Sequence, residues 1–392
     1  MKSSLIAVAL AAVLASAAVP GRAQNATYTI PVILSETGGA AAVGVDELAA
    51  ITAYEKVVNR TGGIKGMPLH FQVYDDGTNA ATAVQLTNTI LAQKPQVVLG
   101  SSLTPATNAM VPFFKDGPVL YAFTPLLYPD KGSYVFATLP THIEAGMLRY
   151  IRGRGWNKIA FLRINDASGQ DNAKSIDLLL SEPDNKSIVT TTSQFFNTAD
   201  LNISAQATAI KNSGAQVLFV SATGAPFGTV LRGLRDAGVD LPIFTGGSNL
   251  APGFISRFDQ LVPKAGLWTV AASFINRDWP AKSSLKPAVD EFYTTLEAAG
   301  LKPGTAHGLG WDAAKIVVAA LRALGPNATA AQIHDWIENL HGFPGALGIY
   351  DFRSGDQHGL GIDSTLVVRY DPASPNGADI MSVAGGAPLP GK

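Results

Sequence analysis

The chain alternates short apolar strands with amphipathic helices, and this alternation limits the folds that it can adopt. A first run starts with the strand "YTIPVILS", continues with the helix "GVDELAAITAYEKVVNRTGG" and returns to a strand at "PLHFQVYDD". A second run starts at "NKIAFLRIND" and extends to "LPIFTGG". Repeated strand–helix units favour parallel sheets with helices on both faces. The sequence therefore predicts an α/β protein built from two doubly wound, Rossmann-like lobes.

One strand end carries a suggestive polar segment, "GSSLTPATNAM", which follows the apolar run Val97–Leu99. Ser and Thr favour helix N-caps, and Pro is tolerated in the first turn. The free N–H groups at such a helix start attract anions. Open α/β sheets also bind ligands beyond the carboxyl ends of their strands. The residues alone leave two interpretations open, an ordinary capped helix and an anion-binding site.

The last third of the chain is less regular. Amphipathic stretches at "SSLKPAVDEFYTTLEAAG", "GLGWDAAKIVVAALRALG" and "TAAQIHDWIENLHG" predict three helices. The segments "ALGIYDFRSGDQHG" and "DSTLVVRYDP" are interpreted as a hairpin-like pair of strands. The end of the chain is rich in Gly, Pro and Ala, so we expect residues 381–392 to form a loose tail.

The first residues are typical of an export signal. Lys2 precedes an apolar stretch over 5–19, and the small residues of "GRAQ" then offer a cleavage site after Ala23. We therefore expect residues 1–23 to be a signal peptide, with a membrane anchor as the alternative. The sequence has no cysteine, which excludes disulfides and a lipid-anchored cysteine. Together these features predict a protein exported to the bacterial periplasm.

Composition and motifs argue against several other functions. The formal net charge is only -1, so nothing points to a nucleic-acid partner. The chain carries no G-x-S-x-G, P-loop or G-x-G-x-x-G signature. Among the scattered histidines, only His334 and His341 lie near one predicted helix, and Asp75 and Asp76 are better explained as a turn. We therefore expect no enzymatic activity, no cofactor and no metal.

Several segments resemble a known family. "NRTGGIKGMPLHFQVYDDGTNAATAV", "VVLGSSLTPATNA", "GWDAAKIVVAAL" and "FPGALGIYDFRSGD" are similar to the leucine/isoleucine/valine-binding type of periplasmic substrate-binding protein, which serves ABC importers. The resemblance implies a type I periplasmic binding protein fold, with two lobes joined by three crossover strands. By analogy, lobe one comprises 24–139 plus 275–345, and lobe two comprises 140–274 plus 346–380.

The resemblance also implies a ligand site between the lobes. Lobe one supplies the residues that match the carboxylate-binding segments and the first loop: Val43, Ser102, Thr104, Thr124, Leu126 and Tyr128. Lobe two supplies cleft-facing loops with Arg163, Asp166, Ser168, Thr223, Gly224, Ser248 and Asn249. Amino-acid binders carry Tyr near Ser168 and near Thr223 or Gly224, and an acid near Ser248 or Asn249. This chain therefore departs from the amino-acid-binding pattern.

These departures define two ligand hypotheses. Arg163 favours an anionic ligand, so the first hypothesis is a small carboxylate without an obligatory amino group. An aromatic acid stacked on Phe123, Tyr128 or Phe227 is one example. Asp166 is able to pair with an ammonium group, so a branched-chain or other amino acid is the alternative. In both cases we expect a monomer that closes on its ligand and docks on an ABC permease, or presents the ligand to a receptor as a sensing subunit.

Overall fold

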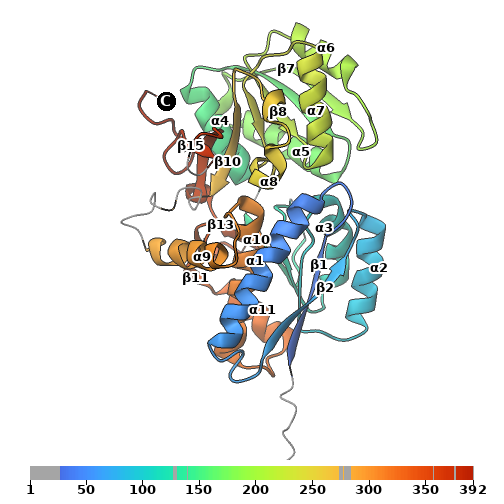
Figure 1. Cartoon of the computed structure of the whole chain (residues 1–392), viewed down its shortest axis with the longest axis vertical. Helices are drawn as coiled ribbons and strands as arrows, with labels where there is room; N and C mark the ends of the chain where they lie inside the picture. The colour runs from blue at the N-terminus through green and yellow to red at the C-terminus, as the bar shows by residue number, and fades with distance from the viewer. Residues whose placement is uncertain are drawn as a thin grey trace, which may run out of the picture.

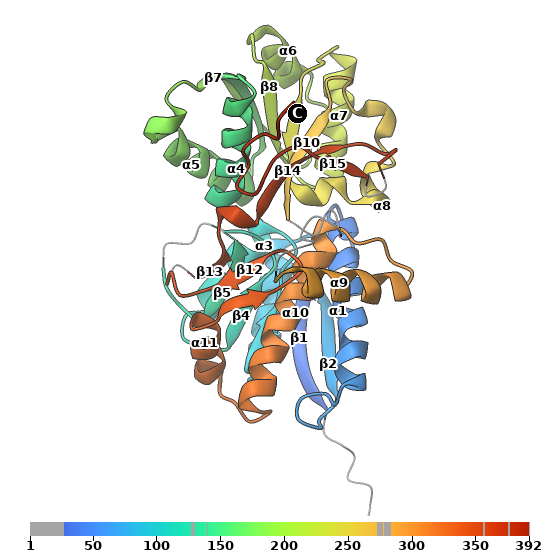
Figure 2. The same ribbon diagram turned by 90° about the vertical axis from the view of Figure 1, so that its left-hand side faces the viewer.

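The computed structural model describes residues 27–126, 130–138, 140–272, 277, 284–355, 357–374 and 377–391. Two sheets divide the chain into two lobes, stacked one above the other in Figures 1 and 2. Among these residues, no helix combines the length and the apolar character that crossing a membrane would require.

Lobe one is built on a parallel sheet of six strands in the order β13-β5-β4-β3-β1-β2. The strands are β1 (Tyr28–Leu34), β2 (Leu69–Asp75), β3 (Val97–Leu99), β4 (Val119–Ala122), β5 (Tyr134–Thr138) and β13 (His358–Leu360). The helices are α1 (Ala41–Arg60), α2 (Ala80–Leu91), α3 (Thr104–Met110), α9 (Lys286–Ala298), α10 (Thr305–Leu324) and α11 (Ala330–Glu338). A short antiparallel pair, β11 (His341–Pro344) with β12 (Ile349–Asp351), lies in the same lobe.

Alternation along β1 explains why helices cover both faces of this sheet. Val32 and Leu34 belong to the core beneath α1, α9, α10 and α11, whereas Ile33 belongs to the core beneath α2 and α3. Successive strand side chains point to opposite faces, so a strand buried on both sides is apolar throughout. Helices α1 and α10 lie side by side in Figure 1. Between them, the rings of Tyr54 and Trp311 pack edge to face, with their centroids 4.8 Å apart.

Lobe two is built on seven strands in the order β15-β14-β10-β9-β8-β6-β7. The strands are β6 (Lys158–Ile164), β7 (Val189–Phe196), β8 (Val217–Ser221), β9 (Ile243–Thr245), β10 (Leu267–Ala272), β14 (Thr365–Tyr370) and β15 (Ala378–Ile380). The helices are α4 (Pro140–Gly153), α5 (Ala167–Ser181), α6 (Ser204–Asn212), α7 (Ala225–Asp236) and α8 (Pro252–Ile255). Strands β6 to β10 run parallel, and β14 and β15 add an antiparallel edge.

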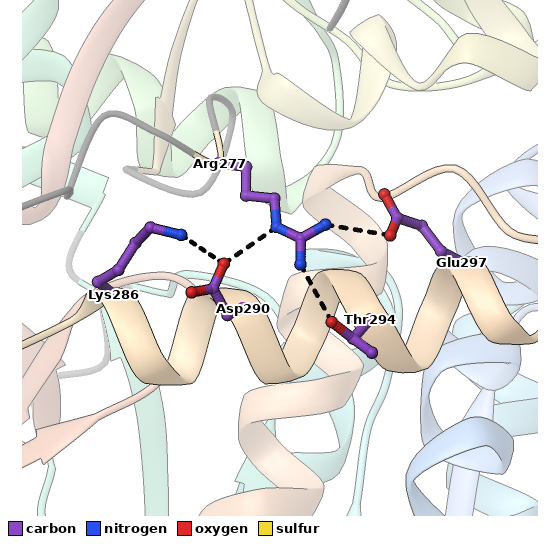
Figure 3. A network of polar contacts seen from close by, with 5 residues as sticks. All are labelled: Arg277, Lys286, Asp290, Thr294 and Glu297. Atoms are coloured by element: carbon purple, nitrogen blue, oxygen red, sulfur yellow. Dashed lines mark hydrogen bonds and ion pairs between the residues drawn. The ribbon is translucent and has the colours of Figure 1, made fainter.

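The chain changes lobes three times, between β5 and α4, between β10 and α9, and between β13 and β14. Arg277 lies on the second of these connections, and Figure 3 shows its side chain across α9. It donates hydrogen bonds to Asp290, Thr294 and Glu297, at 3.0, 3.0 and 3.1 Å. The Lys286 ammonium group donates a hydrogen bond to the same carboxylate oxygen of Asp290, from the side opposite Arg277. These contacts attach the connection to α9.

Three expectations for the last third of the chain are wrong. The segments at 346–359 and 363–372 do not pair as a hairpin, because β12 pairs with β11 whereas β14 pairs with β10 and β15. The third crossover does not lie near Gly345, because β13 still belongs to the sheet of lobe one. Residues 381–391 are not loose: Ser382 bridges Pro388, and Leu389 donates a hydrogen bond to the Met381 carbonyl at 2.9 Å.

Candidate functional site

A cavity of about 430 Å³ lies between the lobes. Its walls come from the segments that follow the carboxyl ends of β1, β3, β4, β6, β8 and β9, and from the connection between β13 and β14. The parallel strands of both sheets thus direct these ends toward one space, which is where doubly wound folds bind ligands. The volume lies in the range of small-molecule sites.

Eight of the residues that the sequence suggested line this cavity: Val43, Ser102, Thr104, Thr124, Asp166, Ser168, Thr223 and Ser248. Hydroxyl groups and apolar side chains share the wall. The larger apolar contributors are Leu103, Ile143, Ile164, Val270, Leu309, Leu347 and Leu360. Among the described residues, Asp166 is the only charged side chain in the wall, and none of the lining side chains is aromatic.

Ser102 connects the cavity wall to buried acids in lobe one. Its hydroxyl accepts a hydrogen bond from the Ser35 backbone N–H at 3.1 Å and donates one to Glu47 Oε2 at 2.5 Å. Glu47 is fully buried on α1, and this burial raises the pKa of its carboxyl to about 8. Asp76, also fully buried, accepts from the Ser35 and Ser101 hydroxyls at 2.7 and 2.6 Å. The segment after β3 is therefore held by carboxyl groups.

Thr104 is the first residue of α3 and faces the cavity. The N-cap of α3 is Leu103, which makes no side-chain capping bond. The sequence left open that this segment is an ordinary helix start capped by a Ser or Thr hydroxyl. The N–H groups in the first turn of α3 have no such cap. Thr124 also lines the cavity, and its hydroxyl donates to the Thr107 hydroxyl of α3 at 3.2 Å.

Asp166 forms the acidic part of the cavity wall. It is the N-cap of α5, and its Oδ1 accepts from the Ser168 N–H, the Gly169 N–H and the Ser168 hydroxyl at 2.8, 3.1 and 2.6 Å. Within the described part of the chain, Oδ2 of this carboxylate accepts no hydrogen bond. One oxygen thus stabilises the helix start while the other is available to a ligand.

Arg163 does not contact the cavity, which corrects the expectation that it serves an anionic ligand. The side chain is buried and donates to Asn172 Oδ1 at 2.6 Å and to the Ser193 hydroxyl at 2.7 Å. Asn172 in turn donates to Glu144, whose carboxyl is buried beside it. Burial lowers the pKa of Arg163 to about 10, and the nearby Glu144 carboxylate partly opposes this. Arg163 is therefore part of an internal network of lobe two.

The remaining predicted residues lie behind the wall or outside the described chain. Asn249 is buried and bonds the Gly224 N–H, the Ala222 carbonyl and the Thr245 hydroxyl. Gly224 is held by that amide and does not line the cavity. Leu126 is buried in the core, and its carbonyl accepts from His358 Nε2 at 3.2 Å. Tyr128 lies outside the described residues.

Of the rings proposed for stacking on an aromatic ligand, the two that lie within the described residues are not in the wall. Phe123 and Phe227 are both fully buried, one in each lobe. Local strand and helix patterns do not show which aromatic side chains turn toward a cleft, because that depends on how the lobes meet.

Other lining residues have no signal in the sequence. Thr198, Thr305, Ser364 and Thr365 bring further hydroxyls to the cavity. Thr305 begins α10, and the pair at 364–365 follows the third crossing. They contribute only because distant segments fold to the same space.

A separate cluster on α11 lies away from the cavity. Potential ligand atoms of His334, Asp335 and Glu338 lie within 4.8 Å of one another. His334 Nδ1 is 3.7 Å from Glu338 Oε2, as expected for partners one turn apart on a helix. None of the three lines the cavity between the lobes.

Comparisons with known proteins agree with this arrangement. A family model described as "Periplasmic binding protein" matches residues 27–375. A leucine-, isoleucine-, valine-, threonine- and alanine-binding protein of Pseudomonas aeruginosa is 24% identical over 212 residues, which cover 52% of this chain and 56% of that protein. The matched region thus spans little more than half the length of that curated relative.

Solved structures share the fold. An extracellular ligand-binding receptor from Rhodopseudomonas palustris HaA2 superposes with a TM-score of 0.79 at 20% identity, covering 91% of this chain and 99% of that one. The branched-chain amino acid transporter substrate binding protein LivJ of Streptococcus pneumoniae, solved with isoleucine, gives 0.71 at 18% identity, with coverages of 90% and 99%. The two-lobed α/β architecture predicted from the sequence is confirmed.

Proposed function

The chain belongs to the periplasmic binding protein family, and we propose that it is the ligand-binding component of an ABC importer for a small amino acid with an apolar side chain. The ligand lies between the lobes, contacts both, and stabilises the closed form. The protein changes no bond in its ligand. An inner-membrane permease receives the closed form, and the protein acts as a monomer exported by its N-terminal signal.

The observation that carries the proposal is the charge of the cavity wall. Asp166 supplies one carboxylate oxygen without a hydrogen-bond partner among the described residues, and the rest of the wall is hydroxyl and apolar. Asp166 is half-buried, and closure of the lobes over a ligand would take its Oδ2 further out of water, which is costly unless that oxygen gains a partner. A ligand ammonium group would pair with Asp166, while its carboxylate would take hydroxyl and backbone donors near Ser102 and Thr104.

The second candidate ligand is a carboxylate without an amino group. The many hydroxyls of the wall favour it, and the same fold would then serve an organic-acid importer. It has less support than the amino-acid proposal, because Arg163, the cation that would favour an anionic ligand, donates to Asn172 and Ser193 instead of lining the cavity. Such a ligand would also leave Oδ2 of Asp166 without a hydrogen-bond donor inside a closed cleft.

Matched ligands test the proposal. Leucine and 4-methylpentanoate differ only in the amino group, so thermal-shift and calorimetric titrations with both, within a panel of apolar amino acids and acids, separate the two candidates. A ligand at about 100 times its Kd should add roughly 2.7 kcal/mol of stability. We expect amino acids to bind and their deaminated partners to bind at least about tenfold more weakly.

Variants assign the effect to one carboxylate. Asp166→Asn should remove the preference for the amino group, whereas Asp236→Asn, an exposed change near the end of α7, should leave it intact. Binding of 4-methylpentanoate as tightly as leucine would overturn the amino-acid proposal. A receptor, instead of a permease, captured with the liganded protein would show a sensing subunit.

A further inference from the structure

We propose that Glu47, which does not line the cavity, is a positioning residue that decides whether the Ser102 hydroxyl offers the ligand a hydrogen-bond donor or an acceptor. The inference rests on the proposed function, because it concerns how the cavity receives a ligand carboxylate.

A serine hydroxyl has one proton to donate and two lone pairs that accept. In Ser102, one lone pair is used by the Ser35 N–H at 3.1 Å, and a second position is used by Glu47 Oε2 at 2.5 Å. Ser102 is 3% exposed and lines the cavity, so the third position is the one left for a ligand. What that position carries depends on which partner in the Ser102–Glu47 contact holds the proton.

With Glu47 ionised, the Ser102 proton points to Glu47, and only a lone pair is left toward the cavity. A ligand carboxylate then meets an acceptor and is repelled. With Glu47 protonated, its O–H donates to Ser102, both lone pairs of Ser102 are filled, and the Ser102 proton turns to the cavity. Only this second state binds a carboxylate oxygen through Ser102.

The surroundings of Glu47 keep the protonated state accessible near neutral pH. Oε1 of Glu47 is buried and finds no hydrogen-bond partner among the described residues, which disfavours the charged form. The charged and titratable groups that face it are acidic: Asp76 after β2 and Asp46, the preceding residue on α1. His307 of α10 lies 3.8 Å from Asp46, and burial lowers the pKa of this imidazole to about 4, so it brings no positive charge. Burial and these acids together favour a neutral Glu47.

The consequence is a ligand affinity that depends on pH. If only the donor state binds, the apparent affinity follows the protonated fraction of Glu47 and falls about tenfold between pH 7 and pH 9. Binding at the alkaline end should also take up as much as one proton per ligand. Calorimetry in buffers of different ionisation enthalpy measures both quantities, with leucine and 4-methylpentanoate as probes.

Two substitutions make the test specific. In Glu47→Gln, the amide N–H₂ donates to Ser102 as protonated Glu47 does, so affinity should equal that of the wild type at pH 7 and stay flat to pH 9. Ser102→Ala should bind more weakly at pH 7 and lose the same pH dependence. The amino group of leucine also loses its proton at alkaline pH, but this affects the wild type and both variants equally, so the difference between them reports on Glu47. Equal alkaline losses in wild type and Glu47→Gln would overturn the inference.

A ligand-free measurement keeps this inference separate from the proposed function. The amide signal of Ser35, which donates to Ser102, should titrate in NMR spectra together with the Glu47 carboxyl carbon, and not in Glu47→Gln. If the Ser35 amide signal does not shift while the Glu47 carboxyl titrates, the inference is overturned. If neither probe binds while the two signals titrate together, the proposed ligand class is wrong and the link between Glu47 and Ser102 is supported.

Discussion

The backbone N–H of Ala225 donates a hydrogen bond to the carbonyl of Gly39 at 3.2 Å, and this bond joins lobe two to lobe one. Gly39 lies in the loop after β1, and Ala225 begins α7. The preceding residue, Gly224, has φ of +71°, and a Cβ placed on it would lie 2.4 Å from the same carbonyl. The lobes approach each other here because residue 224 has no side chain.

Gly224→Ala should therefore hinder closure. The added methyl collides with Gly39 only when the lobes meet, so we expect ligand affinity to fall about tenfold or more through loss of the closed state. Gly214→Ala is a matched control, because Gly214 has φ of +70° and an added Cβ would have nothing within 4 Å. Calorimetry measures affinity, and small-angle scattering measures closure. Equal affinities in the two variants would contradict the prediction.

Asp312 should be needed for stability where α10 packs against the segment 346–350. This buried carboxylate accepts from the Ala346 and Leu347 N–H groups at 2.6 and 2.8 Å and from the Tyr350 hydroxyl at 3.0 Å. In Asp312→Asn, the amide N–H₂ would face one of these donors, so we expect a loss of about 2–3 kcal/mol in urea unfolding. Asp335→Asn, at an exposed position of α11, should change stability by less than about 0.5 kcal/mol. Similar losses in both variants would argue against this role.

Arg163 should matter for folding and not for ligand recognition. Arg163→Ala leaves Glu144 without its nearby cation and removes one buried and one partly buried hydrogen bond, so we expect a loss of about 3–5 kcal/mol in stability. Arg163→Lys keeps the charge but not the forked donors, so its loss should be smaller. The affinity of the folded fraction should stay within about twofold of the wild type, since the side chain does not reach the cavity. A selective loss of affinity in Arg163→Lys would restore a binding role.

Glu47 should also set part of the pH dependence of stability. Burial raises the pKa of its carboxyl from 4.5 to about 8 in the folded protein. Between these values the folded state holds a proton that the unfolded chain releases, so the free energy of unfolding falls as pH rises through this window. Glu47→Gln removes this contribution, and its stability relative to the wild type should rise by more than about 1 kcal/mol from about pH 5 to about pH 8. Urea unfolding at both pH values measures the difference, and a constant gap would contradict it.

Local patterns were sufficient for much of the fold. Apolar strands followed by amphipathic helices define strand–helix units, and parallel strands collect their carboxyl ends at one edge. Those patterns alone placed Ser102 and Thr104 at a strand end, and the resemblance to leucine/isoleucine/valine-binding proteins added Asp166, Ser168 and Thr223 to the same cleft. The structure brings all five to one cavity.

Long-range pairing was not available from the sequence. Strand β13 follows β12 closely along the chain, yet it pairs with β5 and so belongs to lobe one. The residues after 380 look loose by composition, yet they pack on lobe two: the Met381 N–H donates to the Val367 carbonyl of β14, and the Val367 N–H donates to the Ser382 hydroxyl. A strand chooses its neighbour by the burial it gains there, and that gain depends on the whole sheet.

The sequence by itself determined the α/β class, the repeated units and the strand ends that hold most of the cavity wall, because periodicity and turn residues act over a few neighbouring positions. Only the tertiary structure decided what each polar side chain does. Arg163 turns to Asn172 instead of the cavity, and Ser102 bonds Glu47 across 55 positions of sequence. Such contacts depend on burial and on the packing of separate elements, and no local pattern records them.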